Sequence, residues 1–474
     1  MKKETAAPSL RENKMGTMPA GRLLLTMALP LAISMLVQAF YNVVDSIFVA
    51  WYSDNAVTAL SLAFPIQNLQ IGCATGVAVG MNSLLSKSLG EGNRERASQA
   101  AGNGIFLTAV MAALFMLFGA FGTQSYYAMQ GVSQETAKAG VDYTGICSIW
   151  CLGFFIEVLG ERLLQASGKT IYTLFTQGTG AVLNIILDPL FILGSAGLEQ
   201  TLGIRLPFYF PQMGAAGAAV ATVIGQWVAG AMAVVFNLLK NHDVEFALRY
   251  IRPHRETTTK ILTVGIPSMI MMAIGSLMNF FMNQIFLSFK DLGETASGVF
   301  GVYFKLQSFF LMPIFGMNNA SVSIVAFNYG ARQPKRITST LKIAVAVALS
   351  IMLLGLGVFQ LFPDLVLGIF NPTEDFLRIG RSAMQIVSIH FPMAAVGIVL
   401  GASFQALGNG IYSTVTSLCR QLVVLVPAAY LLSLTGNVTL VWWAFPIAEV
   451  VSMTLSLLFF ARIYRKKLRP LFVE

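Results

Sequence analysis

The chain has 474 residues, of which 55% are hydrophobic and only 11% are charged. A soluble globular protein carries about a quarter charged residues, so this composition excludes a chain that lies wholly in water. The formal net charge of +9 would suit a nucleic-acid partner if the basic residues gathered on one soluble surface. They are instead distributed among connections between apolar segments, and we expect no nucleic-acid partner.

Taken in chain order, the apolar runs predict about twelve membrane-spanning helices. Each run is close to the roughly 20 residues that cross a bilayer as a helix, whereas a membrane β-barrel would show short alternating segments. The sequence therefore predicts an all-α polytopic membrane protein. The expected spans are 23–50, 58–86, 101–123, 141–165, 171–194, 213–239, 261–289, 296–328, 340–362, 383–406, 411–434 and 441–463.

Lysine and arginine are unevenly distributed between the two sets of connections. They cluster before the first span, after the second, between the sixth and seventh, after the eighth, and after the twelfth. The alternate connections hold only Lys138, Arg205, Lys290, Arg378 and Arg381. Because cytoplasmic loops carry the excess of basic residues, we expect a multi-pass protein of a bacterial-type inner membrane, with both termini in the cytoplasm. Anionic membrane lipid is a secondary partner that this charge would attract.

The two halves of the chain are related by a duplication. The segment GVAVGMNSLLSKSLGEGNRERA (76–97) aligns without gaps with GMNNASVSIVAFNYGARQPKRI (316–337), and 163–173 aligns at the same offset with 403–413. Each half has six expected spans, so both insert with the same orientation as two pseudo-symmetric bundles, and transporters of this architecture bind substrate in the shared cleft. A duplication kept only for packing is the alternative. We expect a cytoplasmic tail at 1–22, a first lobe at 23–239, a linker at 240–260, a second lobe at 261–463 and a tail at 464–474.

The fifth span carries polar residues that its surroundings do not favour. In VLNIILDPLFIL (182–193), Asn184 and Asp188 are four residues apart and share one helix face. Pro189 follows directly and removes one backbone donor, which bends a helix. A buried carboxylate costs on the order of a few kcal/mol unless it finds partners, water or a proton. Two cations fit the cluster, either Na⁺ held by oxygens or a proton on a desolvated aspartate; the alternative is a polar pair that only bonds within a kinked helix.

Three further carboxylates lie in the first half. Asp45 is near the middle of the first span, which Pro30 is expected to bend. Glu157 lies deep in the fourth span, whereas Glu161 adjoins Arg162, where a structural ion pair competes with a functional role. We treat both glutamates as possible coupling or substrate residues. No cofactor is expected beyond the transported Na⁺ or H⁺.

At this point the chain resembles the MATE (multidrug and toxic compound extrusion) transporters, within the larger superfamily of polysaccharide and lipid flippases. The motifs that carry the resemblance are ALPLAISMLVQAFYNVVDSIFVA in the first span, LGEGNRERA after the second, NIILDPLFI in the fifth and MGAAGAAVATVIGQ opening the sixth. The resemblance implies a V-shaped pair of six-helix bundles. It also implies export of structurally varied, often cationic compounds, driven by inward flow of Na⁺ or H⁺.

The resemblance also implies roles for individual residues. In the branch that couples through its N-terminal lobe, a first-span Asp and a fifth-span Asn and Asp bind the cation, helped by a sixth-span Thr and a first-span Tyr. Motif by motif, these positions fall on Asp45, Asn184, Asp188, Thr222 and Tyr41, and the bending proline falls on Pro30. Other members place acidic residues on the seventh and tenth spans. Those spans offer Asn279, Asn283, Gln284 and His390 here, which disfavours a cation site in the second lobe.

Three other functions compete with a cation-coupled antiporter. A lipid-linked oligosaccharide flippase needs basic residues to hold pyrophosphate, yet only Lys305 and Arg420 lie deep in spans. These two side chains could snorkel toward the membrane surface or pair with Glu449. An intramembrane hydrolase needs a metal-ligating histidine set or a Ser/His pair, but only His390 borders a span, so we expect no enzyme. A channel would repeat its polar rings in both halves. Because two lobes already complete a cleft within one chain, we expect a monomer.

Overall fold

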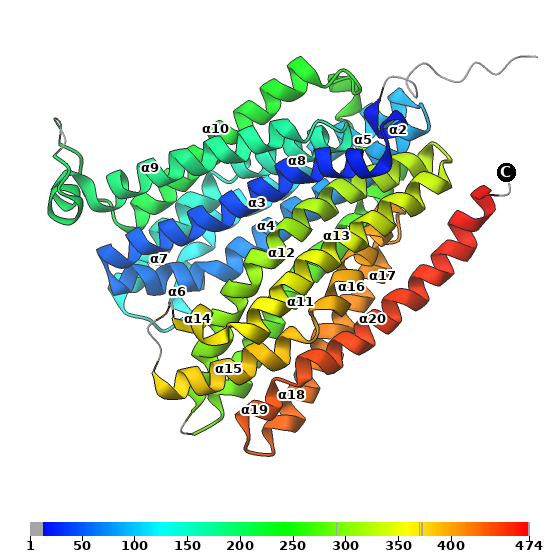
Figure 1. The fold of residues 1–474 in the computed structure, drawn as a ribbon. Helices are drawn as coiled ribbons and strands as arrows, with labels where there is room; N and C mark the ends of the chain where they lie inside the picture. The colour runs from blue at the N-terminus through cyan, green and yellow to red at the C-terminus, as the bar shows by residue number, and fades with distance from the viewer. Residues whose placement is uncertain are drawn as a thin grey trace, which may run out of the picture. The chain divides into compact units, whose positions relative to one another are not determined.

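The structure is a computed structural model that describes residues 13–205, 207, 209–290, 292–368, 370 and 373–472. The start of the expected N-terminal tail, residues 1–12, and the last two residues of the expected C-terminal tail lie outside the described residues. Regular structure in the described part of the chain is helical throughout (Figure 1). The all-α prediction is therefore confirmed.

Helices of the first half follow the expected spans and extend beyond most of them. A short helix precedes the first span, and the fourth span consists of two helices. The bounds are α2 Lys14–Thr17, α3 Ala20–Tyr52, α4 Asp54–Gly90, α5 Arg94–Phe121, α6 Thr123–Ala128, α7 Gln134–Ile149, α8 Leu152–Ala166, α9 Ile171–Leu202 and α10 Ala215–Lys240, with a 3-10 turn η1 at Leu248–Tyr250.

Helices of the second half follow in the same order. The seventh span begins at Arg255, within the stretch expected as a linker. The bounds are α11 Arg255–Leu287, α12 Gly293–Gly330, α13 Pro334–Leu361, α14 Pro363–Gly368, α15 Glu374–Ser388, α16 Phe391–Ala406, α17 Gly410–Leu418, η2 Cys419–Leu425, α18 Val426–Ser433, α19 Val438–Val441, α20 Ala444–Ile463, η3 Tyr464–Leu468 and η4 Arg469–Phe472.

The number of spans agrees with the prediction of about twelve. Among the described residues, ten helical stretches are long and apolar enough to cross a membrane, and two bent helix pairs raise the number to twelve if each pair is one span. The pairs are α7 with α8, bent by 47°, and α15 with α16, bent by 51°. Many large apolar side chains are exposed along these helices, such as Phe121 at 80%. Such extensive exposure indicates surfaces that face lipid.

The backbone repeats the duplication seen in the sequence. Gly168 and Gly408 occupy equivalent positions, and both adopt left-handed φ angles, 77° and 72°. In the turns after the second and eighth spans, Gly92 has φ 73° and its equivalent Arg332 has φ 53°. The breaks in the fourth and tenth spans, after Ile149 and Ser388, fall within one residue of equivalent positions. The two halves therefore share turns and helix breaks, as well as the order of their helices.

Helix starts follow local capping rules. Asn93 accepts a hydrogen bond from the backbone of Arg96 at 2.9 Å to start α5, and Ser133 accepts one from Thr136 at 3.2 Å to start α7. A polar side chain at this position satisfies a backbone donor that the first turn leaves open. The boundaries of these helices are thus set by residues next to the apolar runs.

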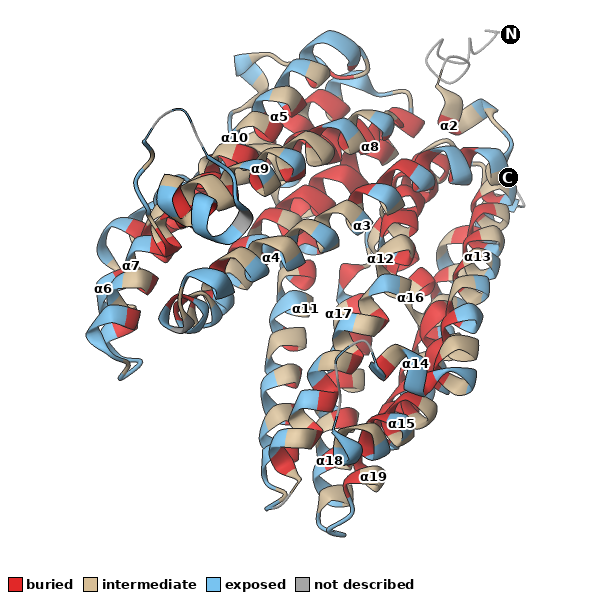
Figure 2. Ribbon diagram, turned by 60° about the vertical axis from the view of Figure 1, so that its left-hand side comes forward, coloured by how far each residue is buried: buried red, intermediate tan, exposed pale blue. Residues whose placement is uncertain are grey.

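Contacts divide the chain into two compact units. The N-unit comprises residues 33–85 and 93–265, and the C-unit comprises 1–32, 86–92 and 266–474. In the N-unit, α10 packs against α7, α8 and α9, and Figure 1 shows α8, α9 and α10 side by side. In the C-unit, α12 and α16 both pack against α13, and buried residues are frequent along α12 (Figure 2). The expected lobe boundaries at 23–239 and 261–463 stay a prediction.

Candidate cation and substrate site

Close packing of α9 against α10 builds one wall of the candidate site. A Cβ atom at Gly225 would lie 2.9 Å from the carbonyl oxygen of Gly180, and one at Gly217 would lie 2.4 Å from the carbonyl oxygen of Phe191. Only glycine permits so close an approach, and small residues at helix contacts are the usual means of packing helices within a membrane. Side chains one turn away from these glycines therefore meet across the helix contact.

Asn184 uses this proximity to connect both helices. Its side-chain nitrogen donates to Asp188 Oδ1 at 3.2 Å, within α9, and lies 3.3 Å from Thr222 Oγ1 on α10. Asn184 and Asp188 are both buried. The expected pairing of two residues on one helix face is thus present, and Thr222 joins it as the resemblance implied.

Asp45 of α3 completes the cluster. The carboxyl groups of Asp45 and Asp188 lie close enough to interact. Asp45 Oδ1, Asp188 Oδ2 and Asn184 Oδ1 are all buried and have no donor within hydrogen-bonding distance. A carboxylate oxygen and an amide oxygen only accept hydrogen bonds. The two aspartates can therefore stabilise each other only through a proton or a cation that lies between them. Buried polar atoms without partners are rare in native structures, and they point to a missing positive charge.

The donor set fits a monovalent cation. It offers two carboxylates, one amide and one hydroxyl, the hard oxygen ligands that alkali and alkaline-earth ions prefer. Among the described residues, no group of three or more His, Cys, Asp or Glu is arranged to hold a metal ion. The oxygens of these four residues could hold a Na⁺ ion or a proton.

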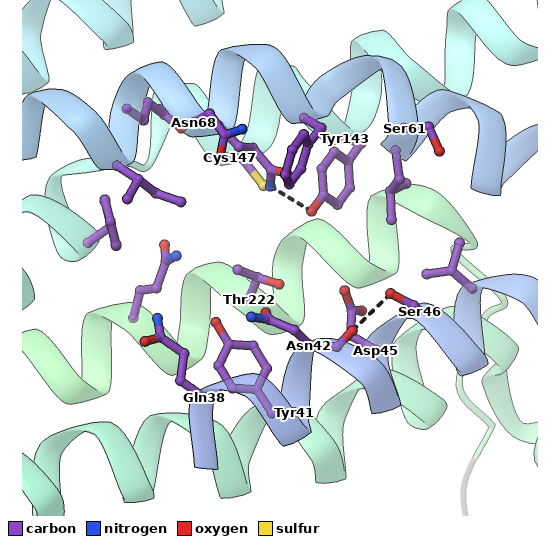
Figure 3. A pocket seen from close by; sticks show the side chains of 18 of the residues that line it. Gln38, Tyr41, Asn42, Asp45, Ser46, Ser61, Asn68, Tyr143, Cys147 and Thr222 are labelled. Atoms are coloured by element: carbon purple, nitrogen blue, oxygen red, sulfur yellow. Dashed lines mark hydrogen bonds between the residues drawn. The ribbon is translucent and has the colours of Figure 1, made fainter. Parts of the chain in front are cut away.

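The cluster borders a cavity of about 550 Å³ in the N-unit. In Figure 3, Tyr41, Asn42 and Asp45 on α3 lie on one side of this cavity and Tyr143 and Cys147 of α7 on the other. Thr222 of α10 also lines it. Drug-sized ligands occupy pockets of about 300–1,000 Å³, so the volume suits a compact organic molecule. Asp45 is the only charged side chain among the described residues that line the cavity.

The two glutamates of α8 have different surroundings. Glu157 lines a small second cavity of about 50 Å³ together with Tyr41, Gln177, Asn184 and Thr222. Glu161 instead accepts hydrogen bonds from Thr176 at 2.7 Å and from Gln177 at 2.8 Å, both on α9. Glu157 therefore belongs with the cluster around Asn184, whereas Glu161 ties α8 to α9.

Both prolines that were expected to bend their helices lie inside helices. Pro30 is within α3 and Pro189 within α9. The one residue with non-helical dihedral angles that interrupts α9 is Gly194, at φ 65° and ψ −177°, five residues after Pro189. Its backbone lies close to Phe210 and Gln212, where the following connection returns toward α9. Glycine is required there because of its left-handed φ and because a Cβ would meet the backbone of Gln212 at 2.7 Å.

Sequence reasoning missed part of the cavity wall. Gln67 of α4 donates to the hydroxyl of Tyr143 at 2.8 Å, and both line the cavity. Gln38 and Asn42 also line it, beside Tyr41 and Asp45. These four residues of α3 are spaced three or four positions apart and so share one helix face. Polar residues recurring on one face of an apolar span could therefore have indicated the cavity wall from the sequence.

The weaker polar candidates lie in the C-unit. Arg420 approaches Glu449 with Nη1–Oε2 at 3.6 Å, so pairing, one of the two alternatives for this arginine, is the arrangement in the structure. His390 is buried beside the break between α15 and α16, where its Nδ1 lies 2.5 Å from the carbonyl oxygen of Val387. That contact lies within one helical turn and ties the imidazole to the backbone at the helix break.

The apolar helices of the described residues, ten single stretches and two bent pairs, together with carboxylates buried at a cavity, define the class as polytopic helical membrane transporters. Residues 30–190 and 267–431 each match the model of the MatE family. The chain therefore belongs to the MatE family, the multidrug and toxic compound extrusion transporters that the sequence resembles.

Relatives of known sequence cover nearly the whole chain. The chain is 24% identical to the FAD transporter of Shewanella oneidensis, over 91% of this chain and 92% of that protein. It is 24% identical to the probable multidrug resistance protein YoeA of Bacillus subtilis, over 98% of each. It is 21% identical to the multidrug export protein MepA of Staphylococcus aureus, over 91% of each. The family thus includes relatives named for drugs and one named for a flavin nucleotide.

Solved structures support the same fold. An outward-facing multidrug resistance MATE transporter of the MOP superfamily is similar with a TM-score of 0.86 and 24% identity, covering 100% of both chains. A MOP superfamily transporter from Pyrococcus furiosus, described as having a binding pocket of reversed polarity, is similar with a TM-score of 0.85 and 24% identity, covering 99% of this chain and 100% of that one. These similarities confirm the predicted fold class.

Proposed function

We propose that the protein is a cation-coupled antiporter that exports organic, often cationic compounds while Na⁺ or H⁺ flows inward. The observation that carries this proposal is the contact between Asp45 and Asp188 at the cavity in the N-unit, where three buried oxygens lack donors. Family membership and the names of the relatives YoeA and MepA favour the same class of substrate.

The coupling follows from competition for negative charge. Two carboxylates in contact repel each other unless a positive charge neutralises one of them. A cationic compound at Asp45 and a Na⁺ ion or proton between Asp45 and Asp188 therefore stabilise the same pair of groups. A site that binds the cation in one conformation and the compound in the other links their gradients.

Each residue of the cluster has a part in this mechanism. Asp45 faces the cavity and senses the compound, whereas Asp188 is buried and holds the cation. Asn184 and Thr222 orient the Asp188 carboxylate by the contacts described above. Tyr41 lines both cavities and so is placed to contact the compound and the cation site together.

The alternative is a flippase of the same superfamily for a lipid-linked oligosaccharide. Such a flippase would hold pyrophosphate with basic side chains, but no lysine or arginine is among the described residues that line the 550 Å³ cavity. The acidic lining favours the antiporter.

Transport in liposomes tests the proposal. Purified protein would be reconstituted, and efflux of ethidium or norfloxacin measured under a Na⁺ gradient and, separately, a pH gradient, for the wild type and Asp45→Asn. Gradient-driven efflux that the variant loses would support the proposal and identify the ion. If neither gradient drives efflux, the antiporter is wrong for these compounds; FAD and lipid-linked substrates would then be tested. If Asp45→Asn pumps as well as the wild type, the coupling site is wrong.

A further inference from the structure

A second polar cavity lies in the C-unit, apart from the cation cluster. Its volume is about 220 Å³, and its walls come from α11, α12, α16, α17, η2 and α20. Arg420 is the only charged side chain among the described residues that line it. The uncharged polar residues on its wall include Asn318, Asn319, Ser417, Ser452 and Ser456. The charge at this cavity is thus opposite to that at the cavity beside Asp45.

Arg420 is only loosely engaged by its acidic neighbour. The shortest approach to Glu449 is 3.6 Å, which is longer than a hydrogen bond between an N–H group and an oxygen. Glu449 Oε1 is buried and has no donor. A guanidinium group offers five N–H donors in a planar fork, and the Arg420 side chain is 31% exposed. The arginine therefore keeps donors for a ligand in the cavity.

Two other polar atoms at the cavity also lack partners. Asn318 Oδ1 and Ser456 Oγ are buried without a hydrogen bond, and Ser456 is fully buried. Both residues line the cavity. A hydroxyl can donate a hydrogen bond to an anion, so Ser456 adds a donor to this cavity. The unpaired oxygens around Asp188, by contrast, only accept hydrogen bonds. Unsatisfied buried groups at a polar cavity indicate that a ligand or water completes their hydrogen bonds.

The backbone that carries Arg420 is unusual. Residues Cys419–Leu425 form a π-helical turn between α17 and α18, and Pro427 lies two residues beyond it. A proline cannot donate to the carbonyl four residues earlier, here that of Val423, so the regular helix is interrupted. Such π-helical turns occur frequently at functional sites. At the equivalent position of the first half, the chain has Gly180 instead of arginine.

We propose that the C-unit binds a small organic carboxylate, held by the Arg420 guanidinium with the Ser456 hydroxyl beside it. A carboxylate can accept two parallel N–H bonds from an arginine. The ligand carboxylate would make these bonds to Arg420, whereas Glu449 at 3.6 Å makes none. The volume of about 220 Å³ is below the range of about 300–1,000 Å³ for drug-sized ligands. The site thus accommodates a compact acid or the acidic end of a larger zwitterion. This inference does not rest on cation coupling at Asp45, and binding alone tests it.

The test is calorimetric titration of the purified full-length protein in a neutral detergent with salicylate, and with its uncharged amide, salicylamide. We expect salicylate to bind and salicylamide to bind at least tenfold more weakly, because a hydrogen bond to a charged group contributes enough for about a tenfold difference. Arg420→Gln should weaken salicylate binding by at least about tenfold. Arg462→Gln is the matched control because Arg462 is exposed near the end of α20 and outside this cavity.

A second variant covers the case in which Arg420→Gln fails to fold. Glu449→Gln removes the competing negative charge but keeps the shape of the side chain, so it should bind salicylate several-fold more tightly. A purely structural ion pair predicts no gain. Equal binding of salicylate and salicylamide, unchanged binding in Arg420→Gln, or no gain in Glu449→Gln would each overturn the proposal. Dimethyl phosphate is titrated in parallel, and tighter binding of this phosphodiester than of salicylate would overturn the assignment to a carboxylate in favour of a lipid headgroup.

Discussion

The side-chain nitrogen of Asn184 on α9 lies 3.3 Å from the hydroxyl oxygen of Thr222 on α10. The same nitrogen donates to Asp188 at 3.2 Å, so a single amide connects two helices and orients a buried carboxylate. Asn184→Ala removes both contacts. Because a hydrogen bond to a charged group contributes about 1.5–3 kcal/mol, we expect the cation concentration that gives half-maximal transport to rise about tenfold or more.

Asn279→Ala is the control for this variant. The Asn279 side chain bonds only within its own helix, to the carbonyl of Gly275 at 3.1 Å. Transport by liposomes containing each variant would be measured over a series of Na⁺ concentrations and of pH values. Equal cation dependence in both variants would contradict a role for Asn184 in the cation site.

The contact between Gly180 and Gly225 gives a second prediction. A methyl group at Gly225 would lie 2.9 Å from a backbone oxygen, so α9 and α10 must separate. Overpacking of this kind costs about 1–3 kcal/mol, and Gly225→Ala should lower the melting temperature and weaken transport together. Gly178→Ala is the matched control on α9 because nothing lies within 4 Å of its added Cβ, and it should be neutral or stabilising by up to about 1 kcal/mol. Thermal unfolding in detergent would measure both, and equal melting temperatures would refute the close contact.

Substitutions at Glu157 and at Glu161 should affect different properties, ion-coupled transport at Glu157 and thermal stability at Glu161. Glu161→Ala leaves the Gln177 side-chain nitrogen without its acceptor, whereas the Thr176 hydroxyl keeps its bond to the carbonyl oxygen of Thr173 at 2.9 Å. A buried unsatisfied group costs about 1–3 kcal/mol. Glu157→Gln keeps the shape of a residue that lines the small cavity beside Asn184. We expect the first variant to lose mainly thermal stability and the second to lose mainly gradient-driven transport. The reverse pattern would show that the two roles are exchanged.

Arg336 should hold the short N-terminal helix α2 in place. It donates to the carbonyl oxygens of Met15 at 2.9 Å and Met18 at 2.6 Å, and to Asn328 Oδ1 at 3.0 Å. Arg336→Ala removes these bonds, each contributing about 1.5–3 kcal/mol, so amide hydrogen exchange in Lys14–Thr17 should accelerate at least tenfold. Lys335→Ala, which changes an exposed neighbour, should leave that exchange unchanged. Unaltered amide hydrogen exchange in both variants would show that Arg336 does not hold α2 in place.

The sequence predicted the spans and the polar pair on α9 because both depend on local spacing. Asn184 and Asp188 meet through the helical repeat alone. The contact of Asn184 with Thr222 depends on how closely two helices approach, and the resemblance alone indicated it. The bond between Gln67 and Tyr143 joins residues 76 positions apart, and no spacing rule connects them. The bend at His390 was also not predicted, since apolar residues continue across it.

The helix break in the fourth span has a consequence for how the protein enters the membrane. Helix α7 has 16 residues and α8 has 15, so at 1.5 Å per residue each is about 24 Å long or slightly less. The hydrocarbon core of a bilayer is about 30 Å thick, and neither helix alone crosses it. We therefore expect α7 and α8 to cross the bilayer only as a pair, so that a chain ending at Ile149 would lack its fourth crossing. The equivalent pair α15 and α16, with 15 and 16 residues, carries the same requirement in the second half.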